Sequence, residues 1–332
     1  MFGADDRFRG AAQSLGVAIQ RMLNAPLEQP AWFAAHPFEP IVENRKAREV
    51  GRTIKVVSFN AQGGGNLEGV VRCLQQKPLA GADIVLLCEA DWRNERSAYR
   101  DFAAEVAKAL QMSFAFVPQF GQREENGTAR PLTGNAVLCS QPLDDIRAIP
   151  IPNRFLHRRL YRKIGVPAGM VARARFNGRL INLGAIHLNS RWDPHGRAAQ
   201  MKEYLNQLPD GPTIIGGDLN TTTLGLQNRK AVIRATLKLA MQPARLSQPQ
   251  RWEGLFQHLE RAGFAIDGAN DPRKRTFTPS RFLPYFLRPN LDWIAVRGLK
   301  PVPRSARAVA AQPSLLSARV SDHDFVMCEI RL

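Results

Sequence analysis

Six short apolar runs of this sequence each lie beside residues that could bind a metal ion or move a proton. The runs are rich in β-branched residues, which is typical of strands. Strand ends place side chains at the rim of a sheet, where loops build binding sites, so these residues could meet in space. In chain order they are Asn60, Glu89, His187, Asp218 with Asn220, Asp292, and Asp322 with His323.

The first two of these residues offer ligands for a hard cation. Asn60 supplies an amide oxygen and Glu89 a carboxylate, and both follow runs that read as adjacent strands. Mg²⁺ and Mn²⁺ prefer such oxygen ligands. Zinc fits less well because the set contains no pair of cysteine ligands. The two residues suit a Mg²⁺ (or Mn²⁺) site, whereas each taken singly is more simply a strand-capping asparagine or a surface glutamate.

The segment around Asp218 could act on a water molecule. Gly216 and Gly217 precede it and let the backbone turn tightly. We expect Asp218 and Asn220 to project to the same side of an extended segment. A carboxylate there can orient or deprotonate water, and the neighbouring amide can donate to a phosphate oxygen.

The elements that must position these residues alternate first and then favour strands. Strands are predicted over 54–59 and 84–88, and helices near 67–76 and 97–110, which is the order of a layered α/β arrangement. Further strands are predicted over 114–117, 136–139, 170–176, 180–186, 213–215, 293–296 and 325–330. Two packed mixed β-sheets flanked by helices would account for both halves. The predicted fold is an α+β, four-layer α/β/β/α sandwich.

The pattern of apolar residues and prolines divides the chain into two parts. Residues 1–52 are predicted to form a helical or irregular extension, because apolar residues at helical spacing give way to a proline-punctuated stretch. Residues 53–332 are predicted to form one catalytic domain. With 332 residues and 44% hydrophobic content, the chain can bury a sizeable core.

Composition also bears on the compartment. No apolar run reaches the roughly eighteen residues needed to cross a bilayer, and the first residues are acidic rather than basic. Four cysteines lie far apart, which favours reduced core residues over disulfides. These features predict a cytoplasmic protein without a transmembrane segment.

The formal net charge of +17 bears on partners rather than on fold. A strongly basic surface attracts polyanions and speeds encounters with them. Nucleic acid, phosphorylated metabolites and anionic lipid surfaces all stay open on this ground. So does a basic surface that is simply solvated.

Taken in order, the motifs resemble the endonuclease/exonuclease/phosphatase superfamily, which includes pancreatic-type DNases, exonuclease III-like repair nucleases, sphingomyelinases and inositol polyphosphate phosphatases. The resemblance runs from about Lys55 to the C-terminus. A Gly-Asn-Ala stretch at 134–136, a His-Leu at 187–188, a Gly-Asp-x-Asn at 217–220 and a Ser-Asp-His at 321–323 carry it. The last two are specific in combination.

The resemblance implies a role for each residue of the metal and phosphate site. Glu89 would bind the metal with help from Asn60, and Asp322 would complete the metal or phosphate shell. Asp218 would position or activate the attacking water. Asn220 would hold the phosphate.

It also implies a role for two histidines. Asp292 would hydrogen-bond His323 and fix its tautomer, so that His323 serves as acid/base or electrostatic partner. His187 would contact the phosphate or assist proton transfer. Asn135, Asn189 and Arg191 are the predicted substrate-binding residues.

Three departures from the family patterns limit the substrate. Residues 185–189 replace the Tyr-x-Pro-Asn segment of exonuclease III-like enzymes, which argues against apurinic-site repair. The Glu that DNase-like enzymes place against the His has no clear counterpart among Phe116, Glu124 and Glu125, so the partner of His187 is unassigned. Residues 139–142 lack the arginine often found after Gly-Asn-Ala.

Two stretches, 154–163 and 273–288, interleave cations with aromatic residues. Such loops can grip a nucleic-acid backbone and stack bases, or seat at an anionic membrane, or simply pack. The motifs and the charge together favour a divalent-metal-dependent phosphoesterase that hydrolyses phosphodiester bonds in nucleic acid. The alternatives are a phosphatase or phosphodiesterase acting on a lipid headgroup or small phosphorylated metabolite, and a catalytically silent binding protein on the same fold.

Overall fold

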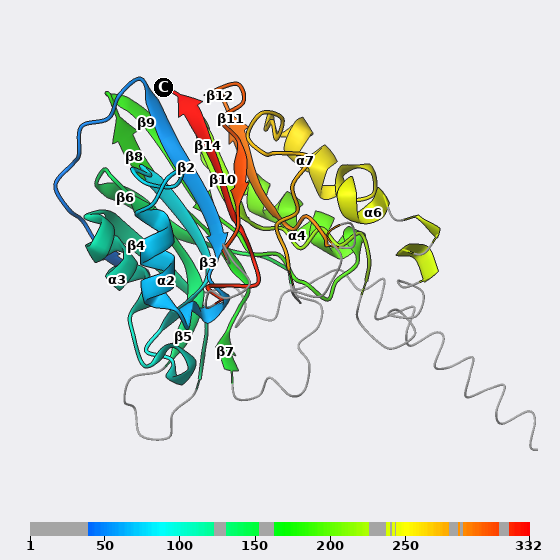
Figure 1. The fold of residues 1–332 in the computed structure, drawn as a ribbon, viewed down its shortest axis with the longest axis horizontal. Coiled ribbons are helices and arrows are strands. Elements are labelled where there is room, and N and C mark those ends of the chain that lie inside the picture. The colour runs from blue at the N-terminus through cyan, green and yellow to red at the C-terminus, as the bar shows by residue number, and fades with distance from the viewer. Residues whose placement is uncertain are drawn as a thin grey trace, which may run out of the picture. The chain divides into compact units, whose positions relative to one another are not determined.

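The computed structural model describes residues 39–122, 131–152, 163–225, 237–239, 241–242, 244–278, 285, 288–311 and 319–332. Two β-sheets pack face to face, and helices lie on both sides of them (Figure 1). Each sheet is mixed, because β2 and β3 run parallel in one and β9 and β10 in the other. The predicted α+β sandwich of two mixed sheets flanked by helices is confirmed.

The larger sheet has nine strands and the smaller has five. The path of the larger sheet is β1 (Ile41–Glu43), β4 (Ser113–Gln122), β5 (Leu132–Cys139), β3 (Ile84–Trp92), β2 (Thr53–Asn60), β14 (Phe325–Arg331) and β12 (Lys300–Pro301). Off this path, β7 (Lys163–Gly165) pairs with β4 and β13 (Arg307–Val309) pairs with β14. The smaller sheet has the order β11 (Asp292–Arg297), β10 (Thr213–Asp218), β9 (Arg179–Ala185), β8 (Ala168–Phe176) and β6 (Leu143–Pro150).

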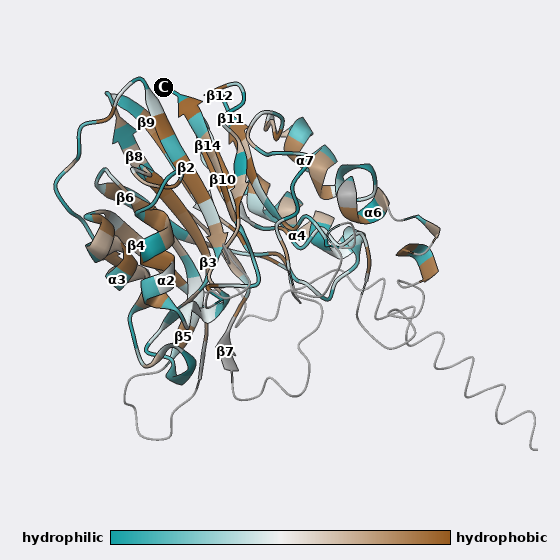
Figure 2. Ribbon diagram, viewed as in Figure 1, coloured by the Kyte–Doolittle hydropathy of each residue, from teal (hydrophilic) through white to brown (hydrophobic). Residues whose placement is uncertain are grey.

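Three separate hydrophobic layers account for the four-layer architecture, and Figure 2 shows the hydrophobic residues concentrated on the strands. Strand β2 illustrates the alternation. Ile54 and Val56 face the core between the two sheets, whereas Val57 and Phe59 face the core under the helices. This is the period of two that a strand buried on both faces requires.

Helices α2 (Leu67–Leu74) and α3 (Phe102–Leu110) cover the larger sheet. Helices α4 (Pro194–Asn206) and α7 (Leu255–Arg261) cover the smaller one, and the short α6 (Ala244–Ser247) precedes α7. Tyr204 of α4 lies against Gly169 and Gly184, and its hydroxyl donates to the Met170 carbonyl at 2.8 Å. The two glycines give the ring its place on the sheet.

Strand directions bring the motif residues to one rim. Strands β2, β3, β9 and β10 end there, and β11 and β14, which are antiparallel to β10 and β2, begin there. The register pairs Asp218 with Asp292 directly across two strands. All six motifs therefore converge, three from each sheet.

The predicted helix near 97–110 begins five residues later, at Phe102. Ala98 and Tyr99 both have left-handed backbones, with φ of 54° and 58°, which no helix tolerates. The sequence analysis also missed α4, α7 and the edge strands. Its 1–52 and 53–332 boundary stays a prediction, since residues 1–38 lie outside the described residues, although β1 already belongs to the larger sheet.

Two further expectations concern composition. All four cysteines are free thiols, and Cys88, Cys139 and Cys328 are buried. Among the helices of the described residues, none has the length and apolar character needed to cross a membrane.

Candidate active site

One amide joins two carboxylates at the centre of the rim. The Asn60 side chain donates from Nδ2 to Asp218 Oδ2 at 3.0 Å and to Glu89 Oε1 at 3.2 Å. Its Oδ1 accepts from the Gln62 backbone N–H at 3.0 Å. Three strand ends, from β2, β3 and β10, are thus tied at one point. This is the convergence that the sequence predicted.

A β-bulge aims Glu89 at that point. Between Leu87 and Ala90 the register of β3 on β5 shifts, and Glu89 adopts a left-handed φ of 50°. A bulge adds one unpaired residue and re-aims its side chain, and bulges are frequent beside active sites. Without it, Glu89 would follow the strand's alternation into a different layer.

Gly217 gives Asp218 its approach to the rim. Its φ is 149°, and a Cβ built on it would lie 1.9 Å from the Ile186 carbonyl oxygen. The strand end of β10 therefore passes β9 more closely than any side chain permits. The same close approach lets the Leu188 N–H donate to the Asp218 carbonyl at 2.9 Å.

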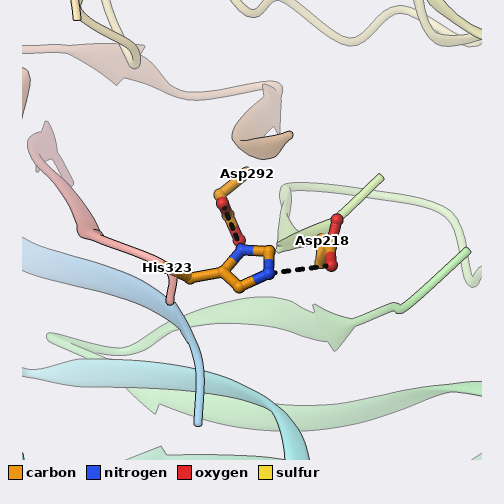
Figure 3. Close-up of side chains that lie close together, drawn as sticks. All are labelled: Asp218, Asp292 and His323. Atoms are coloured by element: carbon orange, nitrogen blue, oxygen red, sulfur yellow. Dashed lines mark hydrogen bonds and ion pairs between the residues drawn. The ribbon is translucent and has the colours of Figure 1, made fainter. Parts of the chain in front are cut away.

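A buried imidazole lies between two carboxylates (Figure 3). His323 Nδ1 is 2.8 Å from Asp292 Oδ2, and His323 Nε2 is 3.6 Å from Asp218 Oδ2. The Asp292 to His323 hydrogen bond is the one that the sequence analysis expected. Phe277, whose ring centroid is 4.8 Å from that of His323, covers the imidazole.

A second imidazole bridges the other half of the site. His187 Nε2 lies 3.5 Å from Asp218 Oδ2, and His187 Nδ1 lies 3.8 Å from Glu89 Oε1. Its side chain is 20% exposed, so it stands at the mouth, whereas His323 is 6% exposed and stands deeper. The partner of His187 that sequence left unassigned is therefore the Glu89 and Asp218 pair; Glu124 and Glu125 lie outside the described residues.

The pKa values of His323, Asp218 and Glu89 are shifted in different directions. Burial alone would lower the pKa of His323, but the carboxylates of Asp292 and Asp218 outweigh it and raise that pKa to about 10. Burial raises the pKa of the Asp218 carboxyl, against the opposing charges of His323 and His187. Burial also opposes ionisation of Glu89, yet His187 and the Asn60 hydrogen bond hold its pKa below the ordinary value. His323 is therefore an imidazolium at neutral pH.

These charges decide where a cation would fit. Asp218, Asp292 and His323 each offer one ligand atom, and these atoms lie within 4.8 Å of one another. A protonated imidazole has no lone pair to give, and its Nδ1 is already bonded to Asp292. Glu89 and Asn60 form the better oxygen set, because the less buried carboxylate is ionised and an amide flip would present Oδ1.

The structure corrects the expected conformation after Asp218. Asn220 has a left-handed φ of 50°, so the segment turns instead of staying extended. Its backbone N–H donates to Asp218 Oδ1 at 2.9 Å, and its side chain donates to the Leu188 carbonyl at 2.8 Å. The turn uses Asn220 to fix Asp218 and the strand that carries His187.

Asn135 lies on β5 opposite the Glu89 bulge, because its neighbours Ala136 and Gly134 pair with Leu87 and Ala90 of β3. It is fully buried, and its Nδ2 donates to the Ala168 carbonyl at 3.0 Å and to the Ala185 carbonyl at 3.5 Å. Both acceptors belong to the smaller sheet. These two bonds join the sheets, whereas Asn135 Oδ1 has no hydrogen-bond partner among the described residues. A contact of Asn135 with substrate stays a prediction.

The remaining predicted residues are Asp322, which contacts His323, and Asn189 and Arg191, which follow His187 in the chain. Asp322 Oδ1 lies 3.9 Å from His323 Nε2, and Asp322 is held by a 3.1 Å bond from its N–H to Gln62 Oε1. The Asn189 side chain accepts from the Arg191 N–H at 2.9 Å and so shapes its own turn. Arg191 is exposed beside it.

Sequence reasoning assigned no role to three residues that support the site. The Ser321 hydroxyl donates to the Asn60 carbonyl at 2.7 Å and accepts from the His323 N–H at 3.1 Å. The Thr276 hydroxyl accepts from the Asp292 N–H at 3.0 Å. Ser321 lay within a quoted motif and Phe277 within the second basic stretch, whereas Thr276 carries no signal in the sequence alone.

Of the two basic stretches, 153–162, 279–284 and 286–287 lie outside the described residues, as do the side chains of 163–165. The described part of the second stretch begins next to the site. Phe277 forms a bridge with His323, and the Thr278 N–H donates to the Asp322 carbonyl at 2.7 Å.

The sequence matches one protein family over most of its length. Residues 57–323 match the model of the Endonuclease/Exonuclease/phosphatase family. A search of curated proteins found no match. The matched span begins in β2 and ends at His323, so it contains all six motifs.

Several solved structures share the fold. One is an endonuclease/exonuclease/phosphatase from Beutenbergia cavernae, at 15% identity and a TM-score of 0.56, covering 85% of this chain and 72% of that one. Another is D. rerio TDP2 complexed with single strand DNA product, at 16% identity and a TM-score of 0.53, covering 85% and 100%. A third is an AP endonuclease from Archaeoglobus fulgidus, at 15% identity and a TM-score of 0.53, covering 83% and 98%. At such identities the likeness shows the fold alone.

Proposed function

The chain belongs to the endonuclease/exonuclease/phosphatase family, and we propose that it is a divalent-metal-dependent phosphodiesterase that hydrolyses nucleic acid. The observation that carries the proposal is the line of groups from Asp292 through His323 to Asp218, next to Glu89 and Asn60. It supplies a carboxylate to orient water, an imidazolium to face phosphate oxygen, and oxygen ligands for a cation.

Glu89 and Asn60 would hold Mg²⁺ or Mn²⁺, with Asp322 at the edge of the same mouth. The ion would supply positive charge that offsets the negative charge gathering on the phosphate oxygens. The clustering of Glu89 and Asp218 about one amide donor supports this, because two carboxylates so placed repel each other unless positive charge lies near.

Asp218 would orient the attacking water and accept its proton. Its Oδ1 is fixed by the Asn220 N–H, and its Oδ2 faces Asn60 and both imidazoles, so one carboxylate edge is aimed at the mouth. The raised pKa of this buried carboxyl makes it a stronger base than an exposed aspartate. Asn220 would help to hold the phosphate while keeping this geometry.

His323 would stabilise or protonate an oxygen on phosphorus. The Asp292 carboxylate accepts a hydrogen bond from the His323 Nδ1–H, which leaves the Nε2–H directed toward Asp218. A pKa of about 10 keeps that proton in place at neutral pH. His187, which is more exposed, would contact the phosphate from the opposite side.

Nucleic acid is the proposed substrate because of charge. A net charge of +17 raises the local concentration of a polyanion far more than that of a small diester. One relative of the same fold is a complex with a single strand DNA product and another is an AP endonuclease. Both structures support the proposal that the substrate is a phosphodiester of nucleic acid.

The test compares hydrolysis of plasmid DNA, single-stranded DNA, RNA, bis-p-nitrophenyl phosphate and phosphoinositides, with Mg²⁺, Mn²⁺ or EDTA. We expect metal-dependent cleavage of nucleic acid that falls by about 10³-fold or more in Asp218→Asn. Asp144→Asn, on the exposed face of β6, is the matched control and should cleave as wild type does. Hydrolysis confined to phosphoinositides or small diesters would keep the chemistry and reject the substrate.

A further inference from the structure

A pocket of about 860 Å³ lies beside the site, between the start of α4, the loop that follows Asn220 and the segment that leads into α7. Cavities of roughly 300–1,000 Å³ accommodate organic ligands of substantial size. The pocket is therefore too large to be a seat for one phosphate alone. The proposed chemistry at Asp218 makes no use of it.

Positive charge dominates the described lining of this pocket, which we call the basic pocket. Its basic residues are His195, Lys238, Arg245, Arg251, His258 and Arg261. Its two acids are already engaged: Asp193 accepts from the Gly196 N–H at 2.9 Å to begin α4, and Glu253 is paired with Arg197. No basic residue of the lining forms an ion pair with any residue that the structure describes.

The clustering of these positive charges is electrostatically unfavourable, and a bound anion would reduce the repulsion between them. Like charges that line one pocket repel each other. The pKa of His258 reflects this, because burial lowers it and the charges of Arg261 and Lys202 lower it further. Polyanions are the ligands that such a concentration of positive charge attracts.

The pocket also offers a flat surface. The guanidinium of Arg245 lies over the partly exposed Trp252 ring, 5.0 Å from its centroid. An arginine and tryptophan pair of this kind provides a stacking surface for a nucleobase. Toward the active site, the wall includes Thr223, whose buried hydroxyl has no hydrogen-bond partner in the structure.

A short length of chain links the pocket to the active site. Thr223 lies three positions after Asn220, a separation of at most about 11 Å. A buried ion pair holds both walls together: Arg197 Nε donates to Glu253 Oε2 at 3.2 Å, and Glu253 Oε1 accepts from the Thr223 N–H at 2.8 Å. Arg197 also donates to the carbonyls of Trp192 and Leu224. The pocket is thus built on the loops that leave the active site.

We propose that the basic pocket binds the nucleic-acid strand a few nucleotides from the scissile bond, with phosphates on its arginines and a base on Trp252. The inference rests on the proposed function, because the strand must run from the phosphate held at Asp218. A base-stacked strand carries one phosphate per roughly 3.4 Å of helix axis, so a reach of about 11 Å corresponds to at most about three nucleotides, and to fewer in an extended strand.

Binding tests the pocket apart from catalysis. A short fluorescein-labelled single strand is titrated by fluorescence anisotropy against Asp218→Asn protein, with and without Arg251→Gln and Arg261→Gln. Both arginines are exposed, so the fold should tolerate their loss. We expect the affinity to fall roughly tenfold at low salt, and the slope of log K against log salt to decrease by about 1.4 for two lost contacts.

The matched control removes two charges at the other end of the larger sheet. Lys300 and Arg331 are exposed partners across β12 and β14, at the end where β2 begins. Lys300→Gln with Arg331→Gln should leave binding within twofold of the parent. In a wild-type background, the arginine pair should raise KM for the strand much more than KM for bis-p-nitrophenyl phosphate.

Equal losses in the arginine and control variants would overturn the pocket and leave the proposed function standing. So would loss of binding to phosphoinositide vesicles in the arginine variant while the strand stays bound, since the pocket would then serve a lipid headgroup. Failure of the wild type to hydrolyse either DNA or bis-p-nitrophenyl phosphate would reject the proposed function itself, whatever the anisotropy shows.

Discussion

Asn60 and His323 both face the Asp218 carboxylate, but one is a neutral donor and the other is charged. Asn60 brings a neutral donor to Asp218 and Glu89, whereas His323 brings a charged one to Asp218 and Asp292. Because three acids meet in a buried space, the charge on His323 is what lets more than one of them stay ionised. The imidazole is therefore expected to control how activity depends on pH.

Replacing Asp292 with asparagine tests that control. The largest charge that raises the pKa of His323 is lost, so this pKa falls from about 10 toward the ordinary value of 6.5. A reaction that needs the imidazolium should then lose activity at lower pH than in wild type. We expect the alkaline limb of the pH profile for bis-p-nitrophenyl phosphate hydrolysis to move downward, with a loss of about 10²-fold at neutral pH.

The control for this variant is Asp267→Asn, an exposed change remote from the imidazole that should leave the profile unmoved. If Asp292→Asn lowered the rate equally at every pH, the carboxylate would be orienting His323 without setting its charge. That outcome would contradict the assignment of an imidazolium.

At the scale of elements, Gly217 is where β10 comes too close to β9 for any side chain. Gly217→Ala would place a methyl group 1.9 Å from the Ile186 carbonyl, so the strand end and Asp218 must shift. We expect a loss of about 2–4 kcal/mol in the free energy of unfolding, and an almost inactive protein. Urea denaturation and diester hydrolysis measure the two effects.

Gly178→Ala is the comparison, because it separates strain from collision. Gly178 also has a positive φ, of 83°, but a Cβ there meets nothing within 4 Å. It should cost only about 1 kcal/mol and keep full activity. Similar losses from both substitutions would mean that backbone conformation, and not the contact with Ile186, explains Gly217.

The Arg197 and Glu253 pair joins α4 to the segment before α7, and both side chains are fully buried. Glu253→Gln would leave a guanidinium charge without its counter-ion. We expect it to lower the free energy of unfolding by about 3–5 kcal/mol. Glu68→Gln, which breaks the exposed pair with Arg100, should change it by less than about 1 kcal/mol in the same urea titration.

Elements with strong patterns were predicted well and those held by tertiary contacts were not. Strands such as β2 and β14 are rich in apolar and β-branched residues, and their bounds differ from the prediction by at most one residue at either end. Helix α4 was missed because its amphipathic pattern is weak: it buries Arg197 and Gln200, which look like surface residues in a sequence. Its burial depends on Glu253, which is far away along the chain.

Within the site, too, features with a sequence pattern were predicted and features that depend on local backbone conformation were not. The convergence of Asn60, Glu89 and Asp218 was predicted because strand ends share a rim. The bulge at Glu89 and the left-handed turn at Asn220 were not, since backbone conformations of this kind leave no periodic signal. The hydrogen bonds of Asn135 to Ala168 and Ala185 across the sandwich were not predicted either, and its contact with substrate stays a prediction.

At the scale of the whole molecule, the sandwich begins before residue 53. Strand β1 pairs with β4, and Asn44 exchanges two hydrogen bonds with Leu143, at 2.9 and 2.8 Å. The Arg45 N–H donates to Ser113 Oγ at 2.9 Å. Residues 37–332 also cluster as one compact unit. A catalytic domain that starts at residue 53, as proposed from sequence, would lose these contacts.

We therefore expect a chain that begins at residue 53 to unfold more easily than one that begins at residue 39. The bonds of Asn44 and Arg45 alone, at about 1 kcal/mol each, predict a difference of about 3 kcal/mol in urea denaturation, and loss of the β1–β4 ladder and of the Arg48 bonds adds to it. Asn44→Ala in the longer chain should reproduce part of it. Equal stabilities of the two chains would show that the domain boundary at 53 is the right one.

The division of the site between two sheets has a consequence for how the protein acquires activity during folding. Asn60, Glu89 and His323 belong to one sheet, whereas His187, Asp218 and Asp292 belong to the other. Asn60 and Asp218 are 158 positions apart, so their contact closes a long loop and must await docking of the two layers. Circular dichroism should recover ahead of hydrolysis when the denatured chain refolds, because each sheet can form its own backbone ladders while the chemistry stays split between them.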